Sequence, residues 1–226
     1  MNTTISPATQ DYLKVIYDLT EESGRATTSQ IADFLAVKPA SVTGMLQKMA
    51  KDDPPLVDYK KHKGATLTNE GRKAALEIMR HHRLLELFLH EILGYSWDEV
   101  HAEAERLEHV ISEDMERRMA AVLGNPSRDP HGQPIPNQNL ELLPNSDVPM
   151  DELRPGQEAI IRRVQDDNPE LLRYLADLGL HPGAKITDVA YVPFDQTLHV
   201  EIGADEDTVV LGPSITGEIS VELKNG

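Results

Sequence analysis

Residues 56–67 of the chain read Leu56-Val57-Asp58-Tyr59-Lys60-Lys61-His62-Lys63-Gly64-Ala65-Thr66-Leu67. Apolar and polar residues alternate at both ends of this run, and its basic middle includes Gly64, a residue that turns favour. The pattern predicts a two-stranded hairpin. The tip of that hairpin would carry three lysines, Lys60, Lys61 and Lys63.

Three helical segments are predicted before the hairpin. Ser6-Pro7 is typical of a helix start, and Thr27 or Thr28 caps a short second helix. A third helix runs from Ala40 to Lys51, after a tight turn at residues 37–39. One helix, a helix–turn–helix pair and a basic hairpin together indicate a winged helix–turn–helix domain.

The third helix has the composition of a helix that reads DNA in the major groove. Recognition helices use short polar or basic side chains that reach base edges and phosphates. An ordinary solvated helix is the alternative, but the segment 38–63 holds six lysines against three aspartates, which favours DNA. We expect a two-fold dimer that reads two half-sites. The candidate contacts on this helix are Lys38, Ser41, Thr43, Gln47 and Lys48.

The net charge of −16 looks unsuited to nucleic acid, but the charge is unevenly distributed. Residues 1–75 hold 10 Lys and Arg against 9 Asp and Glu, whereas the remaining residues hold 12 against 29. We therefore expect phosphate contacts from the N-terminal third alone. The acidic remainder suits cations.

Residues 101–109 read His101-Ala-Glu-Ala-Glu105-Arg-Leu-Glu108-His109. On a helix that runs from about Trp97 to Ile111, the two imidazoles and two carboxylates would share one stripe. A preceding helix, predicted from Thr68 to about Leu93, adds His82 and Glu86 at i and i+4. Nitrogen and oxygen donors that converge in this way favour a divalent cation. The alternative is an exposed helix face, on which such pairs are common.

Composition excludes several classes of site. The chain has no cysteine, so disulfides and thiolate metal sites are ruled out. No apolar run is long enough for a membrane span, and the N-terminus lacks the pattern of a signal peptide, so we expect a soluble, cytoplasmic protein. The sequence lacks the HExxH motif of zinc proteases.

The C-terminal part alternates as strands do. The runs 159–164, 185–192, 197–202, 208–211 and 218–223 are predicted strands, interrupted by a short helix at 169–178, and they suit a small β-barrel. Residues 124–149 hold six prolines and form an irregular linker. The predicted fold is mainly α with a C-terminal β domain, and its three domains are 1–74, 75–149 and 150–226. The apolar surface between Leu84 and Leu123 is the expected dimer face.

Several motifs together resemble the diphtheria toxin repressor family of iron- and manganese-dependent transcriptional regulators. They are Met79-Arg80-His81-His82-Arg83-Leu84-Leu85-Glu86, the run His101–His109, Asn125-Pro126 and Gly132-x-Pro134-Ile135-Pro136. The resemblance covers almost the whole chain. It implies a winged-helix DNA-binding domain, a helical dimerisation and metal domain, and a C-terminal barrel of the Src-homology-3-like FeoA type.

The resemblance also implies two metal sites per subunit. The primary, activating site would comprise Asp11, Glu105, Glu108 and His109. The ancillary site would comprise His82, Glu86 and His101, completed by acidic groups of the barrel, for which the candidates are Asp166, Asp167 and Glu170. Iron-responsive members have Met and Cys where this chain has Asp11 and Glu105, whereas manganese-responsive members have Asp and Glu.

By this resemblance the protein is a repressor of metal uptake or homeostasis genes that binds operator DNA as a homodimer when Mn²⁺ is bound. Fe²⁺ is the alternative activator. Asp11 belongs to the DNA-binding domain and its co-ligands to the next, so the ion would fix the orientation of the recognition helices. A metal-dependent hydrolase or a metal buffer would use similar ligands. However, the sequence offers neither a recognisable nucleophile nor an anion-binding glycine loop, and a buffer would not need the basic hairpin.

Overall fold

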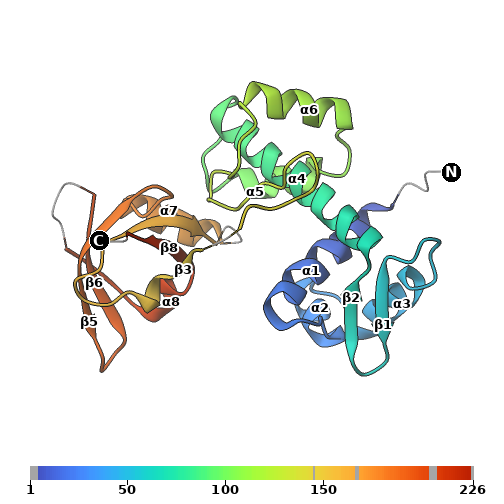
Figure 1. The fold of residues 1–226 in the computed structure, drawn as a ribbon, viewed down its shortest axis with the longest axis horizontal. Helices are drawn as coiled ribbons and strands as arrows, with labels where there is room; N and C mark the ends of the chain where they lie inside the picture. Colours follow the sequence, from blue (N-terminus) through green and yellow to red (C-terminus); the bar gives the residue numbers. More distant parts are fainter. Residues whose placement is uncertain (1–4, 145, 166–167, 204–207, 225–226) are drawn as a thin grey trace. The chain divides into compact units, whose positions relative to one another are not determined.

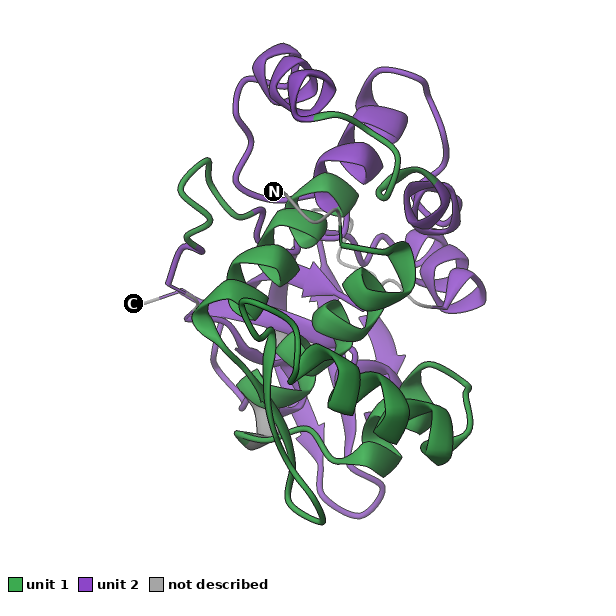
Figure 2. Cartoon of the chain, turned by 90° about the vertical axis from the view of Figure 1, so that its right-hand side faces the viewer, with its two compact units in different colours: residues 1–82, 107–112, 136–141 green, residues 83–106, 113–135, 142–226 purple. Residues whose placement is uncertain are grey.

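The computed structural model describes residues 5–144, 146–165, 168–203 and 208–224. The chain forms two compact units, coloured separately in Figure 2. The first unit comprises residues 1–82, 107–112 and 136–141, and the second comprises residues 83–106, 113–135 and 142–226. The chain therefore returns twice to the first unit after leaving it. The domain boundaries proposed from the sequence at residues 74 and 149 stay predictions.

The first unit begins with a winged helix–turn–helix, as predicted (Figure 1). It consists of α1 (Pro7–Ser23), α2 (Thr28–Phe34), α3 (Pro39–Met49) and the antiparallel strands β1 (Val57–Lys60) and β2 (Gly64–Leu67). Ser6 caps α1, and Thr27 forms a capping box with Gln30 at the start of α2. These local signals explain why the helix starts could be read from the sequence.

The core of this module is formed by one apolar side of each helix. Leu13 and Ile16 of α1, Ile31 of α2, and Leu46 and Met49 of α3 are all fully buried. Since α3 buries its apolar side in this core, its polar side faces solvent.

Ala26 extends the hairpin by a single β-bridge. Its N–H donates to Ala65 O at 3.0 Å, and its carbonyl accepts from the N–H of Ala65 at 2.8 Å. Gly64 makes this approach possible, because a Cβ atom there would lie 2.2 Å from the carbonyl oxygen of Ala26. Gly64 also has φ of +85°, a value that L side chains rarely adopt.

The middle of the chain folds as α4 (Asn69–Glu91), α5 (Val100–Leu107) and α6 (Glu113–Val122). In the second unit, Leu84 of α4 packs with Ala120 of α6 and Ile135 of the linker. The predicted helix from about Trp97 to Ile111 was too long at both ends. It ends at Leu107, so Glu108 and His109 lie in the turn that follows it. The β-branched pair Val110-Ile111 disfavours a further helical turn.

The C-terminal part consists of β3 (Val148–Pro149), the 3-10 turn η1 (Met150–Glu152), β4 (Ala159–Val164), α7 (Pro169–Asp177), β5 (Lys185–Val192), β6 (Thr197–Ile202), β7 (Thr208–Leu211), α8 (Pro213–Thr216) and β8 (Ile219–Leu223). Its strands form a curled six-stranded antiparallel sheet in the order β3-β8-β4-β5-β6-β7, which confirms the predicted small barrel. Fully buried side chains such as Ile161, Leu172, Ile186 and Val221 form its core. The predicted short helix is present as α7.

The linker contacts the barrel within the second unit. The N–H of Val164 donates to the carbonyl oxygen of His131 at 2.9 Å. Gly132 follows with φ of +86°, and a Cβ atom there would lie 1.8 Å from the carbonyl oxygen of Arg162. Trp97, just before α5, packs against the barrel core. Among the described residues, no helix combines the length and apolar character that crossing a membrane requires.

Candidate metal centre and DNA-binding face

Three of the predicted primary-site residues converge in the first unit. Asp11 comes from α1, and Glu108 and His109 come from the turn after α5. One ligand atom from each lies within 4.8 Å of the others. Nε2 of His109 is 2.9 Å from Oδ1 of Asp11 and 3.6 Å from Oε1 of Glu108. Two carboxylates and an imidazole nitrogen thus face one another.

His109 is held by neighbouring residues of α1 on both sides of its ring. The amide oxygen of Gln10 lies 2.8 Å from Nδ1, on the side opposite Asp11. Because an amide oxygen only accepts hydrogen bonds, Nδ1 carries the proton of this contact. The other nitrogen, Nε2, is then the one presented to Asp11 and Glu108.

Glu108 is the most buried of the three, with a side chain only 1% exposed. Lys14 Nζ lies 2.8 Å from its Oε1 and 3.0 Å from its Oε2, and His82 Nδ1 contacts Oε2. Burial alone would raise the pKa of the Glu108 carboxyl, but the hydrogen bonds and charges of His82 and Lys14 outweigh burial and hold this pKa below its ordinary value. Glu108 is therefore a carboxylate at neutral pH. The backbone oxygen of Glu108 lies 3.2 Å from Nδ1 of His81, and this contact helps to hold the turn in place.

Glu105, the fourth predicted primary ligand, belongs to the second unit and contacts His101. Its Oε1 lies 3.7 Å from Nε2 of His101, and its side chain is 58% exposed. Since α5 ends at Leu107, Glu105 does not share a helix face with Glu108 and His109, contrary to the prediction from the sequence. The role of Glu105 in the primary site stays a prediction.

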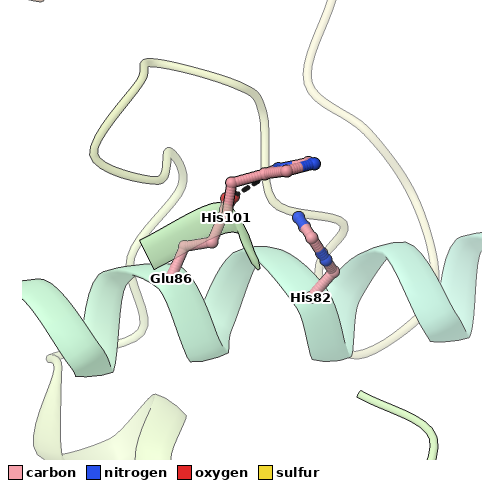
Figure 3. A group of neighbouring side chains, drawn as sticks. All are labelled: His82, Glu86 and His101. Carbon is pink, nitrogen blue, oxygen red and sulfur yellow. Dashed lines mark hydrogen bonds and ion pairs between the residues drawn. The ribbon is translucent and has the colours of Figure 1, made fainter. Parts of the chain in front are cut away.

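The predicted ancillary residues lie together on α4 and α5 (Figure 3). Nδ1 of His101 is 3.1 Å from Oε1 of Glu86, whose side chain is fully buried. His82 precedes Glu86 by one turn on the unbroken helix α4, and one ligand atom of each of the three residues lies within 4.8 Å of the others. A fully buried carboxylate next to imidazoles is an arrangement that a cation would stabilise.

Glu86 also belongs to a second group that the sequence analysis missed. Its Oε2 lies 3.9 Å from Nδ1 of His131, and one ligand atom from each of Glu86, Asp129 and His131 lies within 4.8 Å of the others. All three residues are buried. Nε2 of His131 lies 2.7 Å from the carbonyl oxygen of Trp97 and donates to it, so Nδ1 is the ring nitrogen that faces Glu86.

The position of Asp129 is set by the linker backbone. Its Oδ1 accepts from the N–H groups of His131 and Gln133, both at 2.9 Å. A carboxylate followed by a histidine two residues later, just before Gly132 in a proline-rich linker, was the available signal. Proximity of His131 to Glu86 could not be inferred from the sequence, because the linker has no periodicity.

One of the three barrel candidates, Glu170, lies among the described residues. Asp166 and Asp167 lie outside the described residues. Glu170 is exposed in the first turn of α7 and is not part of any metal-competent group among the described residues. Which of the three faces the ancillary site stays a prediction.

The residues of all these groups fit a hard divalent cation. Carboxylate oxygens and neutral imidazole nitrogens are the donors, and the chain has no cysteine to supply sulfur. Burying the carboxylate of Glu86 is costly unless positive charge lies nearby, and a cation would supply it.

The predicted DNA contacts lie at the surface of the module. Lys38, Ser41, Gln47 and Lys48 are exposed on or just before α3, and Thr43 is half-buried, its hydroxyl donating to the carbonyl oxygen of Pro39 at 3.1 Å. The three hairpin lysines, Lys60, Lys61 and Lys63, are exposed as well. Lys60 forms an ion pair with Asp58 at 3.3 Å. Of these three lysines, it is the only one with an ion pair to a described residue.

Three family descriptions match successive parts of the sequence. They are "Iron dependent repressor, N-terminal DNA binding domain" over residues 4–65, "Iron dependent repressor, metal binding and dimerisation domain" over residues 68–137, and "FeoA domain" over residues 148–223. Together they account for each part of the fold described above.

Curated relatives and solved structures agree with these matches. The iron-dependent repressor IdeR of Mycobacterium leprae is 38% identical over 193 residues, which is 79% of this chain and 82% of that protein. The diphtheria toxin repressor of Corynebacterium diphtheriae is 38% identical over 140 residues, 62% of this chain and 61% of that protein. A manganese-dependent transcriptional repressor in complex with manganese is 37% identical with a TM-score of 0.85, covering 95% of this chain and 99% of that one. ScaR with bound Zn²⁺ has 35% identity and a TM-score of 0.78, with 95% and 98% coverage.

Proposed function

Because the chain belongs to the diphtheria toxin repressor family of iron- and manganese-dependent repressors, we propose that it represses metal uptake or homeostasis genes when Mn²⁺ is bound. The protein is a metal-dependent, DNA-binding transcriptional repressor and not an enzyme. Its DNA-binding and dimerisation domains indicate operator DNA and a second copy of the chain as its partners. Since its target is DNA, we place it in the cytoplasm.

The observation that carries the proposal is the convergence of Asp11 with Glu108 and His109. These residues would hold the activating ion, and Glu105 is the proposed fourth ligand. The ion would supply a double positive charge that the two carboxylates share. Asp11 lies two residues before Leu13, which is fully buried in the winged-helix core. The position of Asp11 therefore determines the position of the whole helix α1, and with it the DNA-binding module.

We propose that a second ion binds at Glu86. His82 and His101 are its expected partners, together with an acidic group of the barrel from Asp166, Asp167 or Glu170. His131 lies next to the other oxygen of Glu86, and Asp129 belongs to the same group, so these two residues are the alternative partners. Glu86 belongs to both groups, so Glu86→Gln should remove the second ion in either case.

Mn²⁺ is the proposed activator because the primary donors are two carboxylates and one imidazole, with no sulfur. Such hard donors suit Mn²⁺, although Fe²⁺ should bind at least as tightly, so selectivity depends on geometry and availability. Fe²⁺ is the alternative, and the names of relatives include both metals. An anaerobic titration of operator binding with each metal distinguishes them. A protein that responds to Fe²⁺ but not to Mn²⁺ at cellular concentrations would contradict the manganese assignment.

The function is tested with Asp11→Asn, which removes a charge from a ligand whose side chain is 43% exposed. The change should leave folding and dimerisation intact, abolish Mn²⁺-dependent operator binding and reduce the Mn²⁺ stoichiometry by one ion per chain. Asp33→Asn, at an exposed position of α2 in the same module, is the matched control. Normal Mn²⁺-dependent operator binding by Asp11→Asn would show that the primary site is wrongly assigned.

A further inference from the structure

Lys14 is placed next to the primary site by the same helix that supplies Asp11. The two residues are three positions apart on α1 and therefore lie on one side of it. Asp11 faces His109, whereas Lys14 faces Glu108, with Nζ at 2.8 Å and 3.0 Å from the two carboxylate oxygens. One helix thus presents both a ligand and a positive charge to the adjacent turn 107–112.

The Lys14 ammonium occupies the oxygens that a metal ion needs. A divalent cation binds carboxylate oxygens directly, through the same lone pairs that accept hydrogen bonds from an ammonium group. The Lys14 side chain is 19% exposed and that of Glu108 is 1% exposed, so solvent screens this pair weakly. Two cations at one carboxylate in such surroundings repel each other strongly.

We propose that Lys14 competes with the divalent ion for Glu108 and so raises the metal concentration at which the repressor binds DNA. The inference rests on the proposed primary site of Asp11, Glu108 and His109. Lys14 acts through Glu108 and is not itself a ligand. Its positive charge stabilises the carboxylate in the protein without the ion, and this stabilisation is lost when the ion takes the carboxylate.

A purely structural ion pair would behave differently. If Lys14 served only to hold the turn 107–112 against α1, its removal would misplace Glu108 and weaken metal binding. If Lys14 competes with the ion, removing its charge should strengthen metal binding. The sign of the change in affinity therefore separates the two roles.

The test is calorimetric titration of the full-length dimer with MnCl₂. Lys14→Met keeps the length of the side chain but removes the charge, and we expect it to bind the primary ion roughly tenfold more tightly. Lys14→Arg keeps the charge, and its planar fork can hold both oxygens of Glu108, so it should bind the ion no more tightly than the wild type. Lys73→Met, at an exposed lysine of α4, is the matched control and should also leave the affinity unchanged. Unchanged or weaker binding by Lys14→Met overturns the inference.

The route through Glu108 is tested by a double-mutant cycle. In a Glu108→Gln background, where the carboxylate that Lys14 occupies is absent, Lys14→Met should increase the affinity much less than it does in the wild type. A gain of undiminished size in this background would mean that Lys14 acts on the ion by another route, which contradicts the proposal.

Thermal denaturation gives an independent readout. Without metal, Lys14→Met should have a lower Tm than the wild type, because the buried Glu108 charge loses a partner. Saturating Mn²⁺ should raise its Tm by more than it raises that of the wild type. An equal or smaller rise contradicts the proposal. Lys14→Gln serves for the same measurements if Lys14→Met does not fold.

The proposal and the function on which it rests fail in different ways. If Asp11→Asn binds as many Mn²⁺ ions as the wild type, the primary site lies elsewhere and both fail. If Asp11→Asn loses one ion but Lys14→Met does not bind more tightly, the proposed function stands and only the role of Lys14 fails.

Discussion

Gln10 determines which nitrogen of His109 faces the primary site. Its amide oxygen lies 2.8 Å from Nδ1, whereas the adjacent residue Asp11 lies 2.9 Å from Nε2. Two consecutive residues of α1 therefore contact the two nitrogens of one imidazole. Partners of this kind orient a metal-ligating histidine and fix the tautomer that leaves the correct nitrogen available.

We predict that Gln10→Leu weakens Mn²⁺ binding at the primary site by about 10–100-fold, the effect typical of losing such a partner. Gln10→Glu keeps an acceptor at this position and should retain most of the affinity. Titration calorimetry measures both. Wild-type affinity in Gln10→Leu would mean that His109 does not depend on this hydrogen bond.

Trp97 should report occupation of the second site. It is the only tryptophan in the sequence. Its ring stacks on that of His131 with centroids 5.7 Å apart. An ion held by Glu86 and His131 would lie close to the indole, and a paramagnetic ion such as Mn²⁺ quenches fluorescence at short range. We predict that Mn²⁺ quenches Trp97 emission in the wild type and in Asp11→Asn.

The same quenching should be lost in Glu86→Gln, which removes the shared ligand. His131→Asn should also reduce it if the ion binds on the Asp129 side, whereas His101→Asn should reduce it if the ion binds on the α5 side. If quenching were instead lost in the primary-site variant Asp11→Asn and kept in Glu86→Gln, the assignment of the second site would be contradicted.

The ion pair between Asp98 and Arg173 should stabilise the second unit at neutral pH, and this stabilisation should be lost in acid. Arg173 Nη1 donates to Asp98 Oδ2 at 2.7 Å, which joins α7 to the segment before α5. Burial raises the pKa of the Asp98 carboxyl, but hydrogen bonds from Ser96 and Arg173 outweigh burial and leave the pKa below its ordinary value. The folded state therefore favours the charged form of Asp98. The stability that this charge contributes is fully present above the ordinary pKa of the carboxyl, and it is lost as the pH falls through the lowered pKa of the folded state.

We predict that Asp98→Asn lowers the free energy of unfolding by about 1 kcal/mol at pH 7. The difference from the wild type should shrink towards zero as the pH falls below the pKa of Asp98. Chemical denaturation at several pH values measures this. A difference that stays constant down to strongly acidic pH would show that the charge of Asp98 is not its cause.

The lysines at the tip of the hairpin should contact phosphate. Replacing Lys61 and Lys63 by Ala should weaken binding about equally on all sequences and reduce the salt slope by roughly one unit per lysine. Lys60 should contribute less, because Asp58 already neutralises part of its charge at 3.3 Å. Binding measured over a range of salt concentrations tests this.

Substitutions on α3 should act differently. Ser41→Ala or Thr43→Val should change the preference among operator sequences with little effect on the salt slope. If replacing both Lys61 and Lys63 by Ala left the salt slope unchanged, the hairpin tip would not contact DNA.

The winged helix was predictable because its signals are local. The caps at Ser6 and Thr27 and the turn at Gly64 each act within a few residues of their own position. The helices between them bury regularly spaced apolar residues. Local rules of this kind hold whatever the rest of the chain does.

The metal groups were predictable only in part, because their geometry depends on where helices stop and on contacts distant in sequence. Glu108 and His109 were identified on the assumption of a continuous helix, although they lie in a turn beyond Leu107. Asp129 and His131 reach Glu86 from a linker whose path depends on the close approach of Gly132 to Arg162. Neither feature leaves a periodic pattern in the sequence.

Gln10 and His109 are 99 positions apart in the chain, and the proposed ligands Asp11 and Glu108 span almost the same interval. An ion bound by both would act as a reversible cross-link around a loop of about a hundred residues, comparable in its entropic effect to a disulfide of that span. Proteases attack mainly the opened chain, and a ligand that binds only the folded form lowers the population of that chain. Starvation for the ion should therefore shorten the lifetime of the repressor in the cell. The amount of repressor, as well as its affinity for DNA, would then follow the supply of metal.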